Sequence, residues 1–208
     1  MATQPLSLNL RHAALLALAL GAGSLPTLTG QAMKTNSSPE TILFDFAQTT
    51  NATWQIVNDD VMGGVSTSSF RITNGVAVFR GEVSLENNGG FASARTLPTP
   101  LEVSAASGFV LRVRGDGQRY KFTARMDSSF DGPLYQNAFA TKRGEWQELH
   151  LRLEDFVPTF RGRVLSGEAL LDVRKLTSVG FLISDQQSGA FQLEIARITT
   201  SPVVPSKS

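Results

Sequence analysis

The sequence contains no cysteine, almost no imbalance of charge and only two histidines among its 208 residues. The absence of cysteine excludes disulfides, thiolate metal ligands and a cysteine nucleophile. The 19 basic and 18 acidic residues give a net charge of +1, so the chain lacks the basic character of a nucleic-acid-binding protein. His12 lies in an N-terminal apolar segment, which leaves His150 alone in the body and argues against a histidine-based triad or metal site.

Helical periodicity is also missing over the length that a domain helix needs, and short runs with strand-like alternation take its place. The runs expected to form strands are 41–46, 69–73, 76–83, 109–114, 120–126, 135–140, 146–153, 179–184 and 191–198. Asn74-Gly75 predicts a tight hairpin turn, and residues 172–176 predict one capped helical turn. Trp54 and Trp146 fall on strands and are expected to be mostly buried. The predicted fold is all-β, a jelly-roll sandwich of two antiparallel sheets with roughly eight to ten strands.

The N-terminus is predicted to be a targeting segment. Arg11 precedes the apolar run 13–20, and Gly30-Gln31-Ala32 has the small-x-small pattern of a signal-peptidase site, so we expect cleavage after Ala32. The predicted organisation is a signal peptide at 1–32, a linker at 33–40, a single domain at 41–200 and a frayed tail at 201–208.

Export from a bacterial cytoplasm, to the periplasm or beyond, is the predicted destination, and two alternatives remain. A mitochondrial presequence agrees with the lack of acidic residues before Glu40, although such presequences are arginine-rich and this one contains only Arg11. An uncleaved segment would anchor the chain, although the run 13–20 is short for a membrane span. After removal of the signal, no transmembrane span is expected.

The stretch 54–66, W-Q-I-V-N-D-D-V-M-G-G-V-S, is the most informative part of the chain. An aromatic-led strand pattern ends at Asp59-Asp60, whose side chains can hydrogen-bond their own backbone in a turn. Gly63 and Gly64 then permit positive φ or close approach of backbone. One interpretation is a structural turn capped by the two carboxylates, and the other is a recognition loop held on a rigid sheet. Neither interpretation provides a catalytic centre.

Two further segments carry more polar and aromatic side chains than a core requires. Residues 82–95 contain two amides, a glycine pair and an arginine, and residues 156–163 place a phenylalanine between a proline and two arginines. Phenylalanine beside arginine is typical of a protein interface or a sugar-stacking platform; the alternative is that the rings are buried and the arginines merely solvated. The residues concerned are Asn87, Asn88, Arg95, Phe160, Arg161 and Arg163.

Acidic pairs give little support for catalysis. The pairs are Asp59 with Asp60, Glu154 with Asp155, and Asp127 with Asp131. A glycosidase needs two carboxyl groups that face each other across a cleft, which sequence spacing does not establish. The pairs also lack the spaced oxygen ligands of a calcium loop, and the glycine pairs lack the spacing of a phosphate-binding loop. We therefore predict no enzymatic activity, no metal ion and no cofactor.

Four blocks of sequence together resemble the complex I intermediate-associated protein 30 family. They are W-x-I-x-N-D-D-V-M-G-G-V-S at 54–66, G-E-V-S-L-E-N-N-G-G-F-A-S-A-R at 81–95, D-F-V-P-T-F-R-G-R at 155–163 and V-G-F-L-I-S-D-Q-Q-S-G-A-F-Q-L-E-I at 179–195. The resemblance implies a galactose-binding-like β-sandwich. It also implies a non-catalytic, chaperone-like factor that binds partly built subunits during assembly of NADH:ubiquinone oxidoreductase.

Two functions are predicted as alternatives. The first is a protein-binding assembly factor whose client is a membrane-complex subunit or assembly intermediate. The second is an exported carbohydrate-binding module, suggested by the fold and by the aromatic and amide side chains of the polar segments. Export argues against the assembly role, because an exported chain cannot reach the cytoplasmic arm of a bacterial complex I. A hydrolase on the same fold is a weaker third possibility.

The predicted binding surface joins the polar turns to the arginines. Its members are Asp59, Asp60, Met62, Gly63, Gly64, Asn87, Asn88, Arg95, Arg125, Asp127, Phe160, Arg161 and Arg163. Polar members gathered on one concave surface would favour a small polar ligand. An apolar patch centred on Met62 and Phe160 would favour a protein client.

Overall fold

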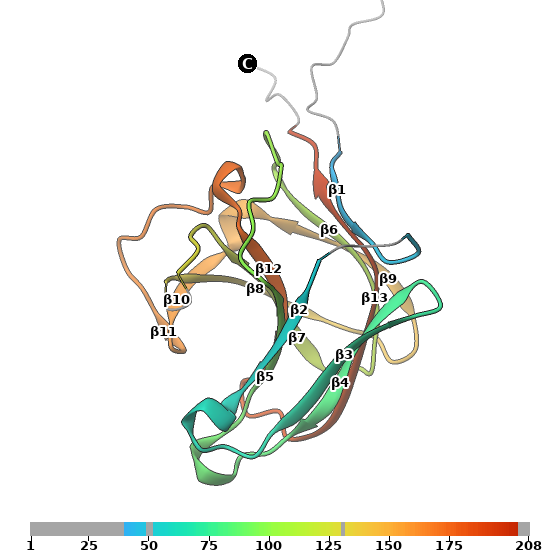
Figure 1. Cartoon of the computed structure of the whole chain (residues 1–208), viewed down its shortest axis with the longest axis vertical. Helices are drawn as coiled ribbons and strands as arrows, with labels where there is room; N and C mark the ends of the chain where they lie inside the picture. Colours follow the sequence, from blue (N-terminus) through green and yellow to red (C-terminus); the bar gives the residue numbers. More distant parts are fainter. Residues whose placement is uncertain (1–39, 49–51, 130–131, 204–208) are drawn as a thin grey trace, which may run out of the picture. The chain divides into compact units, whose positions relative to one another are not determined.

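The computed structural model describes residues 40–48, 52–129 and 132–203, which belong to one compact unit. These residues form two antiparallel β-sheets and no α-helix (Figure 1). The all-β sandwich predicted from the sequence is therefore confirmed. The predicted signal peptide at 1–32 and most of the linker at 33–40 lie outside the described residues.

One sheet has six strands and the other has seven. The six-stranded sheet has the order β3-β4-β13-β6-β9, with β1 also paired to β13. Its strands are β1 (Ile42–Asp45), β3 (Thr67–Thr73), β4 (Val76–Val83), β6 (Gly108–Gly115), β9 (Trp146–Arg152) and β13 (Gly189–Ser201). The seven-stranded sheet has the order β11-β10-β8-β7-β12-β5-β2. Its strands are β2 (Trp54–Asn58), β5 (Ala92–Thr96), β7 (Arg119–Arg125), β8 (Leu134–Ala140), β10 (Val157–Phe160), β11 (Arg163–Val164) and β12 (Ser178–Ile183).

Short 3-10 turns connect several strands: η1 (Asp59–Met62), η2 (Glu86–Asn88), η3 (Leu153–Asp155) and η4 (Val173–Lys175). The predicted helical turn corresponds to η4, where the Asp172 carboxylate accepts a hydrogen bond from the Arg174 N–H at 3.1 Å. The predicted hairpin joins β3 to β4, and Asn74 and Gly75 adopt φ values of 50° and 75°. Both residue types tolerate this conformation, so local chemistry determines the turn.

Three strands were missed by the sequence patterns. β5 consists mostly of small residues, which bury little surface and give a weak alternation signal, and β10 contains Pro158. Proline is confined to strand edges and bulges, so its presence argued against a strand. β11 has only two residues and forms through its pairing with β10. All three strands are defined by pairing with neighbouring strands and not by a pattern in their own sequence.

The core lies between the sheets and is rich in aromatic side chains. Trp54 packs at its margin, where its ring stacks on Phe70 with centroids 4.1 Å apart and is partly buried. Trp146 is 36% exposed, so the prediction that it is mostly buried is wrong. It occupies an outward position of β9, whose inward positions are taken by Leu149 and Leu151. The guanidinium groups of Arg112 and Arg114 on β6 lie over its ring instead.

Candidate functional site

Two loops that are distant in the sequence meet at one end of the sandwich. We call residues 59–66 and 84–91 the tip; they contain η1 and η2 and form the teal and green turns at the lower left of Figure 1. β2 leads into the first loop and β5 leaves the second, and Asn58 and Ala92 are Cα partners in that strand pair. The sheet therefore sets the two loops side by side.

The carboxylate of Asp59 links the two loops. It is fully buried, and its Oδ2 accepts hydrogen bonds from the N–H groups of Gly90 and Phe91 at 2.6 and 3.2 Å. Within its own loop, Oδ1 accepts from the Ser66 N–H at 2.9 Å and Oδ2 from the Ser66 hydroxyl at 2.5 Å. The Ser66 Oγ in turn accepts a hydrogen bond from the Ser84 N–H at 2.9 Å. The tip is thus a single cross-linked unit.

Two glycines lie against this carboxylate because no side chain fits there. A Cβ on Gly64 would lie 2.4 Å from the Cγ of Asp59, and a Cβ on Gly89 would lie 2.6 Å from its Oδ2. Gly63 has a different role, since its φ of 91° ends η1. The two glycine pairs singled out in the sequence are therefore parts of one structural feature. Asp59 supports the tip from beneath and presents no surface to a partner.

Hydrogen bonding also sets the ionisation of Asp59. Burial by itself would raise its pKa, but hydrogen bonds from the Ser66 hydroxyl and from the backbone N–H groups of Gly90, Ser66 and Phe91 outweigh burial and lower the pKa below its ordinary value of 3.8. The group is therefore charged at neutral pH.

The solvent-facing side of the tip is apolar and acidic. Its exposed apolar side chains are Val61, Met62, Val65 and Leu85, at 68%, 62%, 48% and 45% exposure. Its exposed polar side chains include Asp60, Glu86, Asn87 and Asn88. Met62 and the polar residues Asp60, Asn87 and Asn88 were predicted from the sequence, whereas Val61, Val65 and Leu85 were not. These three residues lie in turn sequences, where no strand can direct their side chains into the core. That position in the sequence would have identified them as exposed.

Two predicted arginines lie on the outer face of the seven-stranded sheet. Arg95 is three residues beyond Ala92 along β5, and its Cα partner in β12 is Gly180. A Cβ at Gly180 would lie 2.9 Å from the Cβ of Arg95. Arg125, at the end of β7, is 8% exposed and donates from Nη1 to the carbonyl oxygen of Gly132 at 2.6 Å. Asp127 follows in the same connection, close to Gly132.

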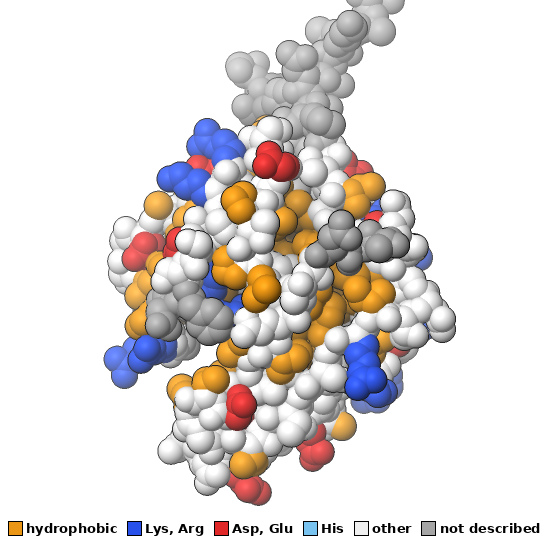
Figure 2. Space-filling view, in the orientation of Figure 1, with side chains coloured by type: hydrophobic (Ala, Val, Ile, Leu, Met, Phe, Trp, Pro, Cys, Tyr) orange, Lys and Arg blue, Asp and Glu red, His pale blue; other side chains and the backbone are white. Residues whose placement is uncertain are grey.

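The remaining predicted residues occupy the β10–β11 hairpin. Phe160 is 37% exposed, and the Arg161 guanidinium lies 5.2 Å from its ring centroid. Arg161 and Gly162 form the turn with φ values of 48° and 78°, and Arg163 begins β11. Figure 2 shows a hollow between the region of this hairpin and the region of the tip. The structure thus places the predicted residues in three groups, and their joint action in binding stays a prediction.

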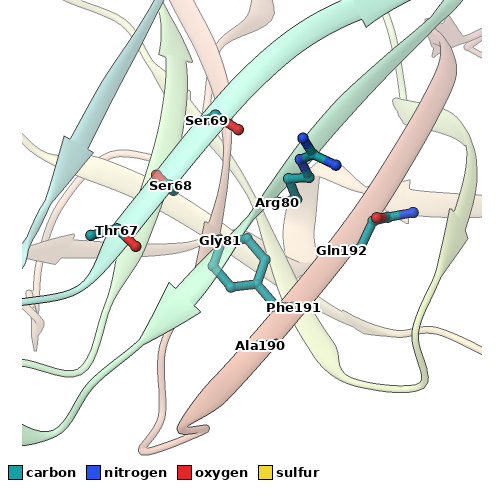
Figure 3. Close-up of a pocket in the computed structure, with 8 residues that line it drawn as sticks. All are labelled: Thr67, Ser68, Ser69, Arg80, Gly81, Ala190, Phe191 and Gln192. Carbon is teal, nitrogen blue, oxygen red and sulfur yellow. The ribbon is translucent and has the colours of Figure 1, made fainter.

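A shallow depression of about 450 Å³ lies on the six-stranded sheet (Figure 3). Gly81 forms part of it, and a Cβ there would lie 2.0 Å from the Thr67 carbonyl oxygen. The lining residues are Thr67, Ser68, Ser69, Arg80, Gly81, Ala190, Phe191 and Gln192. They include no carboxylate and no histidine, so they do not supply a general acid–base pair.

His150 is exposed on β9, and its Nε2 lies 3.7 Å from the Oε1 of Glu148. Among the residues that the structure describes, no three His, Asp or Glu side chains form a group that would hold a metal ion. Within the same ranges, no helix has the length and hydrophobicity to cross a bilayer.

Comparison with known families identifies the domain. Residues 44–195 match the family described as complex I intermediate-associated protein 30. The chain belongs to this family. The match extends from β1 into β13 and includes both loops of the tip, so the resemblance expected from the four sequence blocks is confirmed.

Curated relatives in the family carry the same description with the word mitochondrial. The Neurospora crassa protein is 27% identical over 144 residues, covering 61% of this chain and 52% of the relative. The Drosophila melanogaster protein is 25% identical over 178 residues, covering 74% of this chain and 60% of the relative. The Mus musculus protein is 36% identical over 89 residues, covering 41% of this chain and 27% of the relative. The chain spans about half the length of most of the relatives it matches, and less of the mouse protein.

Solved structures show the same fold at low sequence identity. A family 11 carbohydrate-binding module of Clostridium thermocellum superposes with a TM-score of 0.54 and 15% identity, covering 82% of this chain and 98% of the module. An agarase, AgWH50C, superposes with a TM-score of 0.55 and 12% identity, covering 80% of this chain and 25% of the enzyme. At such identities the likeness establishes the β-sandwich and nothing about ligands.

Proposed function

We propose that this protein is a non-catalytic assembly factor that binds a protein client, a subunit or intermediate of a membrane complex such as complex I. Membership of the complex I intermediate-associated protein 30 family supports the class of function. The tip is the proposed contact surface.

The observation that carries the proposal is the exposed apolar surface on a rigid support. Val61 and Met62 are more than half exposed on a turn that is held by the buried Asp59 carboxylate. A preordered surface binds a partner at lower entropic cost than a mobile loop does. Exposed apolar residues that cluster on a protein surface are typical of interaction sites. The exposed apolar residues around Met62 therefore support a protein client, while Phe160 lies apart from them on the β10–β11 hairpin.

The absence of catalysis is part of the proposal. The Asp59 carboxylate is saturated by four hydrogen bonds and buried, so it is a poor general base. Its neighbour Asp60 is exposed at the tip. Neither residue is placed to act with the other across a cleft.

The compartment is proposed from the N-terminal sequence, which lies outside the described residues. Its composition supports export, whereas the names of the relatives support mitochondrial import as the alternative. After export, only the membrane part of a bacterial complex I would be within reach, whereas import into mitochondria would not exclude its other arm.

A carbohydrate-binding module remains the second candidate. One cross-strand row of the seven-stranded sheet holds the outward polar side chains of Gln55, Arg95, Thr123 and Gln136, interrupted by Gly180. Such a row favours a polar ligand. The described strand residues on this face include no aromatic ring for stacking against a sugar, so the protein client is preferred.

The test is restoration of complex I in the native host. We expect deletion of the gene to lower the amount of assembled complex I, and the wild-type chain to restore it. A variant with Val61→Ser and Met62→Ser should fail to restore assembly while keeping its melting temperature. The matched control carries Ile72→Ser and Leu170→Ser, which are 46% and 73% exposed and lie outside the tip. An unchanged amount of complex I after deletion would reject the proposed function.

A further inference from the structure

We propose that the tip recognises a basic amphipathic segment of its client, in which apolar residues are flanked by lysine or arginine. This inference rests on the proposed function, because it takes the tip to be the client-binding surface. It adds the chemistry of the segment that binds there.

The exposed charge of the tip is acidic. Its two loops, residues 59–66 and 84–91, carry the exposed carboxylates of Asp60 and Glu86 and contain no lysine, arginine or histidine. The whole chain carries a net charge of +1, so this end departs in sign from the molecule as a whole. Figure 2 shows acidic and hydrophobic side chains together at the lower end of the view, with the basic side chains lying higher. Complementary charge on a partner would steer its approach and fix its orientation.

The same two loops expose apolar side chains beside these acidic groups. Val65 precedes Ser66 and Leu85 follows Ser84 in the sequence. Hydrogen bonds between Ser66 and Ser84 therefore link the two parts of the chain that carry these apolar residues. Leu85 also packs beside Gly90, where a Cβ would lie 3.2 Å from its Cδ2. Val61 and Met62 are exposed on η1 in the first of the two loops. The unbranched thioether of methionine adapts to partner side chains of different shapes.

The side chains of the tip disfavour other classes of occupant. A phosphate-rich partner, either nucleic acid or an anionic bilayer, would be repelled by the exposed carboxylates of Asp60 and Glu86. A purely cationic partner would leave the apolar side chains exposed to water. A segment with one apolar face and basic flanks would match both the apolar and the acidic side chains of the tip.

The test measures binding of defined peptides to the full-length protein by fluorescence anisotropy. One probe is a synthetic amphipathic peptide with a leucine face and lysine flanks; the second replaces every lysine with glutamate, and the third replaces every leucine with serine. We expect the lysine–leucine peptide to bind at least about tenfold more tightly than either of the others, with affinity falling as salt is added.

Charge-neutral variants locate the interaction. Asp60→Asn with Glu86→Gln should weaken binding of the lysine–leucine peptide by about fivefold, the scale of two exposed ion pairs. The matched control, Glu102→Gln with Glu168→Gln, changes two exposed acidic residues outside the tip and should leave the affinity unchanged. Val61→Ser with Met62→Ser should weaken binding without altering its salt dependence.

The outcomes separate this inference from the function on which it rests. Equal binding of the lysine and glutamate peptides, or an equal loss in the tip and control variants, would overturn the basic-segment inference even if the tip variant fails to restore complex I. Conversely, selective peptide binding combined with unchanged complex I after gene deletion would keep the recognition chemistry and reject the assembly role.

Discussion

Asp59 and Gly90 are 31 residues apart in the sequence, and the Asp59 Oδ2 accepts a hydrogen bond from the Gly90 N–H at 2.6 Å. This contact joins the loop after β2 to the loop before β5. It makes the exposed surface of the tip depend on a side chain that is itself fully buried. Stability and the proposed binding therefore involve separate residues, which allows them to be tested separately.

Replacing Asp59 with Ala should destabilise the fold by about 3 kcal/mol, because the N–H groups of Gly90, Phe91 and Ser66 would lose their acceptor in a buried site. Urea unfolding followed by fluorescence would measure the loss. The control is Asp60→Ala, whose exposed side chain should change stability by less than about 0.5 kcal/mol. Equal effects of the two substitutions would contradict the proposed structural role of Asp59.

Acid should remove the contribution of Asp59. Its pKa is lowered in the folded state, so its stabilising effect is complete above the ordinary value of 3.8 and is lost as the pH falls through the folded-state pKa. The difference in unfolding free energy between the wild type and Asp59→Asn should therefore be constant near neutral pH and should shrink below about pH 3.8. Asp172 and Asp185 also have lowered pKa values, but they are present in both proteins and cancel in this comparison. A difference that grows on acidification would contradict the assignment.

The two tryptophans should differ in their effect on stability. Trp54→Ala removes a ring stacked on Phe70 at the core margin and should cost about 3 kcal/mol. Trp146→Ala should cost only about 1 to 2 kcal/mol, because its ring packs mainly against the guanidinium groups of Arg112 and Arg114. The Cζ atoms of these arginines lie 5.7 and 5.0 Å from the ring centroid. Denaturation midpoints of the two variants would decide this, and a reversed order would show that β9 is assigned to the wrong face.

Glycine substitutions should separate crowding from backbone strain. Gly64→Ala and Gly89→Ala would force a methyl group into the Asp59 carboxylate, so each should destabilise by more than about 2 kcal/mol. Gly189→Ala is the control, since its φ of 100° causes strain although no atom lies within 4 Å of the added Cβ. That control should cost about 1 kcal/mol. If Asp59→Ala relieves the defect of Gly64→Ala, the clash with the carboxylate is its cause.

Sequencing the N-terminus of the native protein tests the predicted export. We expect Met33 as the first residue, because Gly30-Gln31-Ala32 has the pattern that signal peptidase cleaves. Recovery of this species outside the cytoplasm would support export. A cytosolic protein that begins at Ala2 would refute it, and a start elsewhere within an organelle fraction would favour mitochondrial import.

Local chemistry in the sequence determined most of the strands and their turns. Residues 76–83 were predicted as a strand and form β4 with the same bounds, since alternation of side chains is a property of each strand alone. The Asn74-Gly75 turn followed from backbone conformations that these two residue types accept. The acidic pair Asp59-Asp60 and the glycine pairs Gly63-Gly64 and Gly89-Gly90 indicated turns, because strands seldom contain these residue types.

Tertiary structure alone decided what these residues do. No local pattern shows that Asp59 faces Gly89 and Gly90, because the hydrogen bonds form only when β2 and β5 are paired. The same holds for β5, whose small residues become a strand between two neighbours, and for the exposure of Trp146, which follows from the face of β9 that packs on the core. The sequence specified strands and turns through short-range interactions. Burial and long-range hydrogen bonds, which exist only in the folded chain, gave the Asp59 carboxylate its structural role and left the apolar residues of the tip exposed.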